Sequence, residues 1–205
     1  MSSVHPSKGQ QTRDLIIARA HDLALRGGLD GLTIGTVADT MQMSKSGVFA
    51  HFGSREDLQL AVLEHASRTF ADAVFVPALK QRRGLPRLLA LLKGIADFHV
   101  GLSPQGGCVM FSATVEYDDR PGPIRDAVVT YQRQLRRELG RTVQMAIDAG
   151  DLRAETDAEQ LAFELYGLML AVQHDLRVFA DPRTLDRAQR GVTDLLARWR
   201  AASTP

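Results

Sequence analysis

The sequence LTIGTVADTMQMSKSGVFAHFGSREDL, residues 32–58, contains three helix starts in close succession. Thr33, Ser44 and Ser54 are good N-cap residues, because each side-chain oxygen can accept a hydrogen bond from a free N–H of the first turn. The apolar residues that follow Thr33 have helical spacing and are Ile34, Val37, Ala38 and Met41. Two short helices joined by a tight turn are typical of a helix-turn-helix, in which one helix braces the other in a groove of DNA.

The second of these helices has a first turn suited to phosphate. Ser44, Lys45, Ser46 and Gly47 lie at its start, where free N–H groups and the positive end of the helix dipole attract anions. No acidic residue occurs between Ser44 and Arg55. Each of these residues taken alone is more often an ordinary solvated surface residue. Together, at this spacing, they favour binding to DNA.

The same stretch resembles the DNA-binding domain of TetR/AcrR-type transcriptional regulators, over roughly residues 11–60. The matching segments are Thr33 with Val37-Ala38, then Ser44–Phe52, then Ser54–Leu58. The resemblance implies an all-α fold, with an N-terminal helix-turn-helix domain over residues 1–55 and a helical effector-binding and dimerisation domain over residues 56–205. It also implies double-stranded operator DNA as a partner. The residues expected at the DNA are Thr33, Thr36, Ser44, Lys45, Ser46, Gly47, Phe49, His51 and Arg55.

Three positions depart from the family pattern. Gln42 stands where the turn usually has glycine, and a left-handed conformation costs a residue other than glycine about 1 kcal/mol, so we expect a turn built differently. His51 replaces an aromatic residue that often contacts phosphate, and its charge depends on pH. Ala50 replaces a larger polar residue and removes one possible base contact. The operator sequence therefore does not follow from relatives.

The composition is that of an ordinary globular protein. The 205 residues are 44% hydrophobic and 24% charged, with a net charge of +1, so a positive surface must be local. The single cysteine, Cys108, excludes an intramolecular disulfide and a cysteine-rich zinc site. The N-terminus has no apolar signal region and no run approaches the length of a membrane span. We expect a cytoplasmic protein with no membrane partner.

The remaining sequence predicts helices throughout. Residues 1–9 are expected to be a disordered tail, and a helix from Ser54 to about Ala73 would lead from the first domain into the second. Residues 108–117 have the composition of a strand, but a lone strand would have no partner, so we predict a helix. The other expected helices span residues 10–26, 86–99, 124–149, 157–179 with Thr156 as cap, and 182–201.

The last two helices carry broad apolar stripes. In the first of them the stripe is Leu161, Leu165, Leu168, Met169, Val172 and Leu176, widened by Phe163, Tyr166 and Leu170. The second has Leu185, Ala188, Val192, Leu195, Leu196 and Trp199. One internal core would explain both stripes. The family resemblance implies instead that they also form a homodimer through a four-helix bundle.

The sequence contains no motif of an enzyme, so we expect neither catalysis nor a cofactor. Glu116, Asp118 and Asp119 are expected to be solvated, and a soft metal site from His99, Cys108 and His174 is a weak alternative to ordinary packing. The resemblance implies a small-molecule effector, which we expect to be apolar or amphipathic. Aromatic and soft residues that suit such a pocket, or the core, are Phe98, Met110, Phe111, Tyr117, Tyr131, Phe163, Tyr166 and Met169. The competing hypothesis is an all-α ligand-binding or catalytic protein that does not bind DNA.

Overall fold

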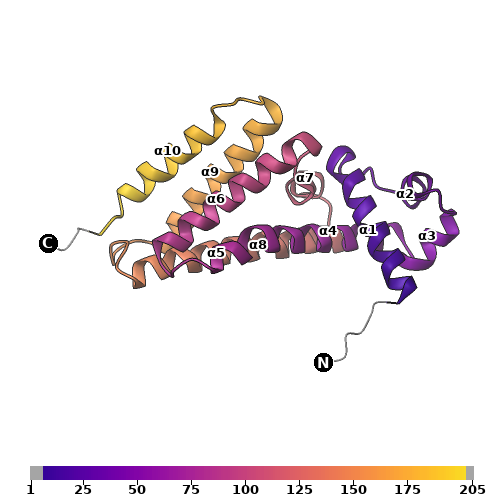
Figure 1. Cartoon of the computed structure of the whole chain (residues 1–205), viewed down its shortest axis with the longest axis horizontal. Helices are drawn as coiled ribbons and strands as arrows, with labels where there is room; N and C mark the ends of the chain where they lie inside the picture. Colours follow the sequence, from indigo (N-terminus) through magenta and orange to yellow (C-terminus); the bar gives the residue numbers. More distant parts are fainter. Residues whose placement is uncertain (1–6, 202–205) are drawn as a thin grey trace. The chain divides into compact units, whose positions relative to one another are not determined.

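The structure is a computed structural model that describes residues 7–201, and its regular elements are helices, which confirms the all-α prediction (Figure 1). Within residues 7–201 the structure also has an isolated antiparallel β-bridge between Leu152 and Arg200. The helices are α1 (Lys8–Gly27), α2 (Ile34–Met41), α3 (Lys45–Phe52), α4 (Arg55–Phe70), α5 (Val76–Leu79), α6 (Leu85–Leu102), α7 (Val109–Glu116), α8 (Pro123–Asp148), α9 (Ala158–Val178) and α10 (Thr184–Ala197). A π-helical turn covers Ala71–Phe75 and a 3-10 turn covers Ser103–Gln105.

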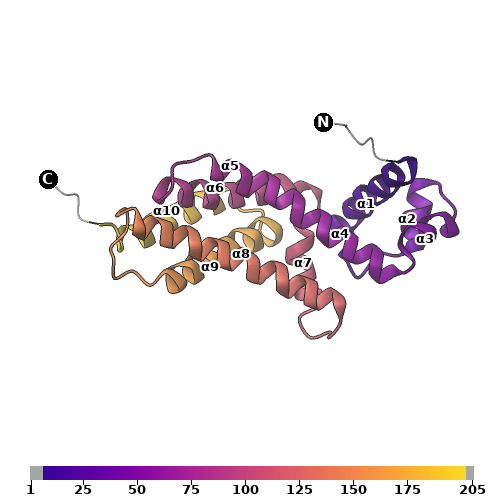
Figure 2. The same cartoon turned by 90° about the horizontal axis from the view of Figure 1, so that it is seen from below.

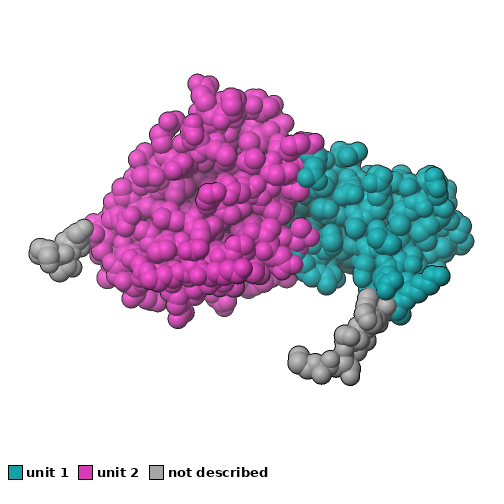
Figure 3. Space-filling view, in the orientation of Figure 1, with its two compact units in different colours: residues 1–68, 105–129 teal, residues 69–104, 130–205 magenta. Residues whose placement is uncertain are grey.

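The chain forms two compact units (Figure 3). Unit 1 contains the described residues up to 68 together with residues 105–129, and unit 2 contains residues 69–104 and the described residues from 130 onward. The helix α7 and the start of α8 thus belong to the same unit as the predicted helix-turn-helix, although α6 precedes them in the sequence. The boundary predicted after residue 55 separates a DNA-binding domain from an effector-binding and dimerisation domain. It divides the chain by function and not by compactness, and it stays a prediction.

The first helix of unit 1 begins two residues earlier than the sequence indicated. The Ser7 hydroxyl accepts a hydrogen bond from Gln10 N–H at 3.2 Å, so the cap starts α1 at Lys8. Lys8 and Gly9 are therefore helical, and residues 1–6 of the predicted tail lie outside the described residues. Leu29 and Leu32, in the loop after α1, are buried as expected. The other buried residues of α1 to α3 are Ile16, Ile17, Ala20, Ala24, Leu25, Val37, Ala38, Val48 and Phe52.

The turn between α2 and α3 keeps the left-handed conformation even though it lacks glycine. Gln42 has φ 55° and ψ 37°, and its N–H bonds to the carbonyls of Ala38 and Asp39. The expectation of a differently built turn is wrong, because these bonds satisfy carbonyls at the end of α2 and offset the strain of the residue. The turn thus delivers Ser44 to its position as the cap of α3.

The helix that leaves the helix-turn-helix is interrupted by a π turn. The chain stays helical from Arg55 to Leu79, but Val76 N–H bonds to the Ala71 carbonyl, five residues back. Pro77 explains the change, since it has no N–H to donate to the carbonyl four residues earlier and its ring crowds that group. The sequence predicted a helix to about Ala73 and gave no sign of this wider turn.

Unit 2 is a layered bundle around one apolar core. Helix α9 packs against α6 on one side and against α10 on the other (Figures 1 and 2). Leu88, Leu165 and Val172 are among the residues that fill this core. The cap of α9 is Asp157, whose carboxylate accepts from two N–H groups; the predicted cap, Thr156, instead donates to the Arg153 carbonyl. No helix of residues 7–201 has the length and hydropathy needed to cross a membrane.

Candidate nucleic-acid interface

The first turn of α3 is capped and open to solvent. Ser44 Oγ accepts a hydrogen bond from Gly47 N–H at 3.0 Å and lies 3.2 Å from Ser46 Oγ. Ser44, Lys45 and Ser46 are all exposed. One N–H of the turn is therefore satisfied by the cap, while the positive end of the helix remains available to an anion.

Lys45 extends from α3 across α2. A Cβ atom on Gly35 would lie 3.3 Å from Lys45 Cε and 3.6 Å from its Nζ, so a larger residue at position 35 would push this side chain away. The ammonium group is thus close to the first turn of α2, which has its own positive dipole end. Like charges gathered in this way on an exposed surface favour binding of a phosphate.

The start of α2 is held by a reciprocal pair of threonines. Thr33 Oγ1 accepts from Thr36 N–H at 3.0 Å, and Thr36 Oγ1 accepts from Thr33 N–H at 3.1 Å. Their hydroxyl groups are therefore engaged in capping. Thr36 remains exposed, so the predicted DNA contact and the cap are compatible at that residue.

The outer face of α3 carries two exposed apolar residues. The Phe49 side chain is 53% exposed, and Ala50 beside it is also exposed. His51 is half-buried, with its ring centroid 6.4 Å from that of Phe52. The Arg13 guanidinium lies 4.9 Å above the Phe52 ring, so α1 brings a cation to the same helix. Arg13, which the sequence already placed in the helix over residues 10–26, was not among the predicted DNA-binding residues.

Arg55 differs from the other predicted DNA contacts because its guanidinium has internal partners. Its Nε donates to the Leu32 carbonyl at 2.9 Å, and its Nη2 donates to the carbonyl and to Oδ1 of Asp30. The side chain braces the loop between α1 and α2 against the start of α4. These internal bonds account for a cation at this position, and its contact with DNA stays a prediction.

Asp30 is the centre of a polar network within unit 1. Arg120 Nη1 lies 3.2 Å from its Oδ2, and the Tyr117 hydroxyl donates to its Oδ1 at 3.4 Å. Hydrogen bonding by Arg120, together with the positive charges of Arg120 and Arg55, holds the pKa of Asp30 below its usual value. The turn after α7 is thereby attached to the loop that precedes the helix-turn-helix.

Two further groups reinforce that attachment. Glu116 Oε2 accepts from the Asp30 N–H at 2.7 Å, so the prediction that Glu116 is merely solvated is wrong. Buried Gln59 donates to the Leu29 carbonyl at 2.7 Å and to the Tyr117 hydroxyl at 3.3 Å. Gly28 has φ 75°, and a Cβ there would meet the Glu116 carboxylate. The hydrogen bonds of Glu116 and Gln59 join residues that are 30 to 86 positions apart in sequence, so local patterns do not reveal them.

The predicted effector residues are divided between the two units. Met110, Phe111 and Tyr117 belong to unit 1, whereas Phe98, Tyr131, Phe163, Tyr166 and Met169 belong to unit 2. Tyr117 is committed to the Asp30 network, and the Tyr166 hydroxyl donates to Gln132 at 2.9 Å. Met169 is a buried core residue, while Phe163 is 55% exposed.

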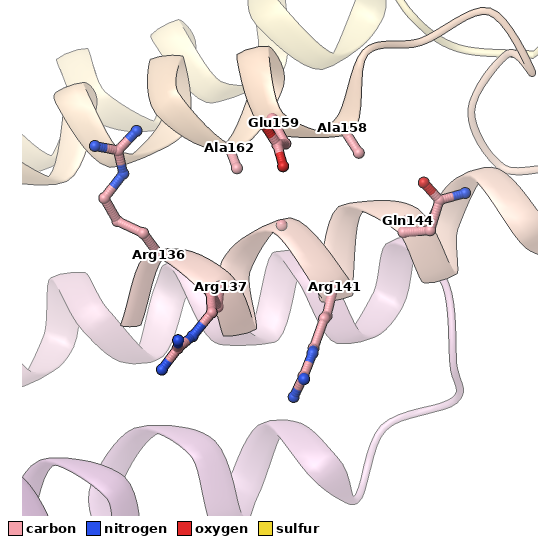
Figure 4. A pocket seen from close by; sticks show the side chains of 8 residues that line it. Arg136, Arg137, Arg141, Gln144, Ala158, Glu159 and Ala162 are labelled. Atoms are coloured by element: carbon pink, nitrogen blue, oxygen red, sulfur yellow. The ribbon is translucent and has the colours of Figure 1, made fainter. Parts of the chain in front are cut away.

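An open groove of about 410 Å³ separates part of α8 from α9 (Figure 4). Its lining residues are Arg136, Arg137, Gly140, Arg141, Gln144, Ala158, Glu159 and Ala162. In Figure 4 Arg136 extends toward α9, whereas Arg137 and Arg141 point away from Glu159. The Arg136 guanidinium lies 5.3 Å from the Phe163 ring centroid and 5.7 Å from that of Tyr166. The arginines do not converge on one point, and the groove is not the predicted apolar pocket.

The weak metal alternative finds no support. Cys108 belongs to unit 1 and is buried, which raises the pKa of its thiol, whereas His99 and His174 belong to unit 2. Among residues 7–201 no three histidine, cysteine or acidic side chains are grouped so that they could hold a metal ion.

Two family models match the chain. Residues 16–62 match "Bacterial regulatory proteins, tetR family", and residues 84–192 match "Tetracyclin repressor-like, C-terminal domain". No curated protein matches the sequence.

Solved structures share the fold over almost the whole chain. A TetR-family transcriptional regulator from Cytophaga hutchinsonii is 20% identical with a TM-score of 0.86, and the match covers 97% of this chain and 100% of that one. A TetR transcriptional regulator from Chloroflexus aurantiacus is 25% identical with a TM-score of 0.85, over 95% and 99% of the two chains. AibR, in complex with isovaleryl coenzyme A and operator DNA, is 18% identical with a TM-score of 0.70, over 90% and 97%. The second family model alone spans more than half of the sequence, so the chain belongs to the tetR family of bacterial regulatory proteins, which are ligand-responsive, DNA-binding transcriptional regulators and not enzymes.

Proposed function

We propose that this regulator is a repressor that binds a palindromic operator as a homodimer, with α3 of each chain in the major groove, and that an apolar or amphipathic effector releases it. The observation that carries the proposal is the exposed start of α3, where Lys45 lies over the first turn of α2. A helix used only for packing has no need of a bare cationic first turn. Ser44, Ser46 and Gly47 would hold phosphate beside Lys45, and Phe49 would face the bases.

A second copy of the chain is the partner that fits the outer face of α9. The middle of one side of this helix exposes Phe163, Gly167, Leu170, Ala171 and His174, and the charged residues Glu159 and Arg177 are exposed only near its two ends. Leu161, Leu165, Met169 and Val172 from the predicted stripe are already buried inside the chain, so the internal core does not account for the outer face. The exposed residues of α10 are mostly charged or polar, which suits the rim of such an interface.

The effector is proposed to enter unit 2 near the carboxyl end of α6. Phe98 and Phe70 pack edge to face there, with ring centroids 5.2 Å apart. His99 Nδ1 is buried and has no hydrogen-bond partner within residues 7–201, so an oxygen of a ligand would satisfy it. AibR was solved with isovaleryl coenzyme A, a molecule with an apolar acyl group and a polar remainder. That precedent supports an amphipathic effector for this chain as well.

Coupling between effector and operator is proposed to use the segments that join the units. One is the helical path from α4 through the π turn into α5, and the other is residues 105–129. The Asp30 network would carry a shift of the latter segment to the loop before α2. A typical coupling of about 1–3 kcal/mol changes operator affinity roughly 5- to 150-fold. Operator DNA must then weaken effector binding by the same factor, which calorimetry on free and DNA-bound protein can measure.

Binding to the promoter DNA that flanks the protein's own gene tests the proposal. We expect retention of one promoter fragment at a salt concentration that releases fragments of equal length from elsewhere in the genome. Equal retention of all fragments at every salt concentration would contradict operator recognition by this chain.

A further inference from the structure

Apart from Lys45, the residues that α3 presents outward lack the side chains that usually read purines and cytosine. Ser46, Phe49 and Ala50 are exposed and lie on one side of the helix, since positions three and four apart share a face. Val48 and Phe52 are buried on the opposite side. Arginine and lysine read guanine, asparagine and glutamine read adenine, and acidic residues read cytosine; of these types α3 contains only Lys45.

Lys45 is the one long donor of α3, and its position points to the backbone of DNA. Its chain runs along Gly35 of α2, with Nζ 3.6 Å from where a Cβ on that glycine would be. Positions 45 and 49 share a face of α3, but the Lys45 side chain extends toward α2. This placement suits a phosphate contact, which carries no sequence information of its own.

Apolar groups in the major groove have one specific counterpart, the C5-methyl group of thymine. We propose that α3 recognises its half-site mainly through thymine methyl groups, which contact the Phe49 ring and the Ala50 methyl group. The inference rests on the proposed role of α3 as the recognition helix and names what that helix reads. It explains why a ring that is 53% exposed lies in the middle of an otherwise cationic and polar surface. Specificity then depends on the positions of A·T pairs rather than on bidentate hydrogen bonds.

Deoxyuridine tests this inference, because it pairs as thymine does but lacks the methyl group. The probe is the duplex that full-length protein enriches from a pool with a randomised 20-base-pair centre. It is resynthesised with deoxyuridine in place of single thymines. Burying one methyl group changes affinity about 4-fold, so we expect a loss of that size at one or two positions in each half-site. Substitution in both half-sites should give roughly a 16-fold loss.

Variants at position 49 assign the effect to the ring. Phe49→Ser should bind the thymine duplex more weakly and should no longer distinguish it from deoxyuridine at the position read by Phe49. Phe49→Leu keeps an apolar group and should retain most of the discrimination. Val115→Ser is the control, since Val115 is also an exposed apolar residue of unit 1 but belongs to α7. Thermal unfolding followed by circular dichroism checks that each variant is folded.

The outcomes separate the inference from the proposed function. If the enriched duplex binds equally well with thymine and with deoxyuridine throughout, methyl recognition is wrong while operator binding stands. Undiminished discrimination by folded Phe49→Ser would also overturn the inference, because the methyl group would then be read by another residue. If the pool yields no enriched sequence, the proposed operator binding itself fails.

Discussion

Arg55 Nη2 lies 3.1 Å from Asp30 Oδ1, which joins the first residue of α4 to the loop between α1 and α2. The same guanidinium donates to the Leu32 carbonyl, just before the cap of α2. On the other side of Asp30, Arg120 approaches within 3.2 Å from the turn after α7. The frame that orients the helix-turn-helix thus includes a segment far away in sequence.

Arg55→Ala should lower the free energy of unfolding by about 1 kcal/mol, because two backbone carbonyls and a carboxylate lose a charged donor that is only partly solvated. It should leave the salt dependence of DNA binding unchanged. Urea unfolding and a salt titration measure the two effects. Arg68→Ala removes an exposed pair with Glu64 and is the control, with an expected loss below about 0.5 kcal/mol. A normal stability with a reduced salt slope would instead make Arg55 a phosphate contact.

The left-handed turn at Gln42 predicts an ordered series of stabilities. Gln42→Gly relieves the strain of φ 55° and should be at least as stable as the wild type. Gln42→Val introduces a branched side chain at the same φ and should be less stable than the glycine variant by about 1–3 kcal/mol. Thermal unfolding at one protein concentration gives both values. Equal stability of the two variants would mean that the turn is not left-handed in solution.

Charges on the outer face of α9 should prevent dimerisation. Phe163 and Leu170 are exposed, so the double variant Phe163→Glu, Leu170→Glu should fold as a monomer at micromolar concentration. Light scattering measures the mass, and circular dichroism checks the fold. Leu195, on α10, is buried within the chain, so a charge at that position would disturb folding rather than dimerisation alone. Leu79→Glu places a charge on another exposed apolar residue and should leave the dimer intact. A wild-type monomer, or a dimer of the double variant, would contradict this interface.

Acidification should destabilise the protein through His99. Burial lowers the pKa of its imidazole from 6.5 to about 4, so the folded chain keeps this group neutral where the unfolded chain takes up a proton. The associated stability is complete above pH 6.5 and decreases as the pH falls toward 4, by about 3 kcal/mol in all. His99→Leu should remove that part of the pH dependence while the other titrating groups still contribute theirs. The same dependence in both proteins would show that His99 is solvated.

The sequence predicts the helix starts well, because an N-cap acts within its own turn. Thr33 and Ser44 cap the helices expected from them, whereas the cap of α9 moved by one residue to Asp157. The sequence did not predict the Asp30 network, because its partners Glu116 and Arg120 follow α6 and are far from Asp30 in the sequence. Only the folded chain brings them together. Arg55 shows the same limit, since a cation after a recognition helix fits phosphate binding and internal bracing equally well until its neighbours are known.

Lys45→Ala tests most directly whether α3 binds DNA as proposed. Each phosphate contact contributes about 0.9 to the slope of log affinity against log salt, so a dimer that loses two such contacts should lose about 2 from its slope. Affinity at low salt should fall for operator and unrelated DNA alike, because phosphate contacts carry no sequence information. Lys80→Ala, at the end of α5, is the control and should leave the slope unchanged. A Lys45→Ala protein with the wild-type slope and affinity would contradict the placement of α3 at the DNA.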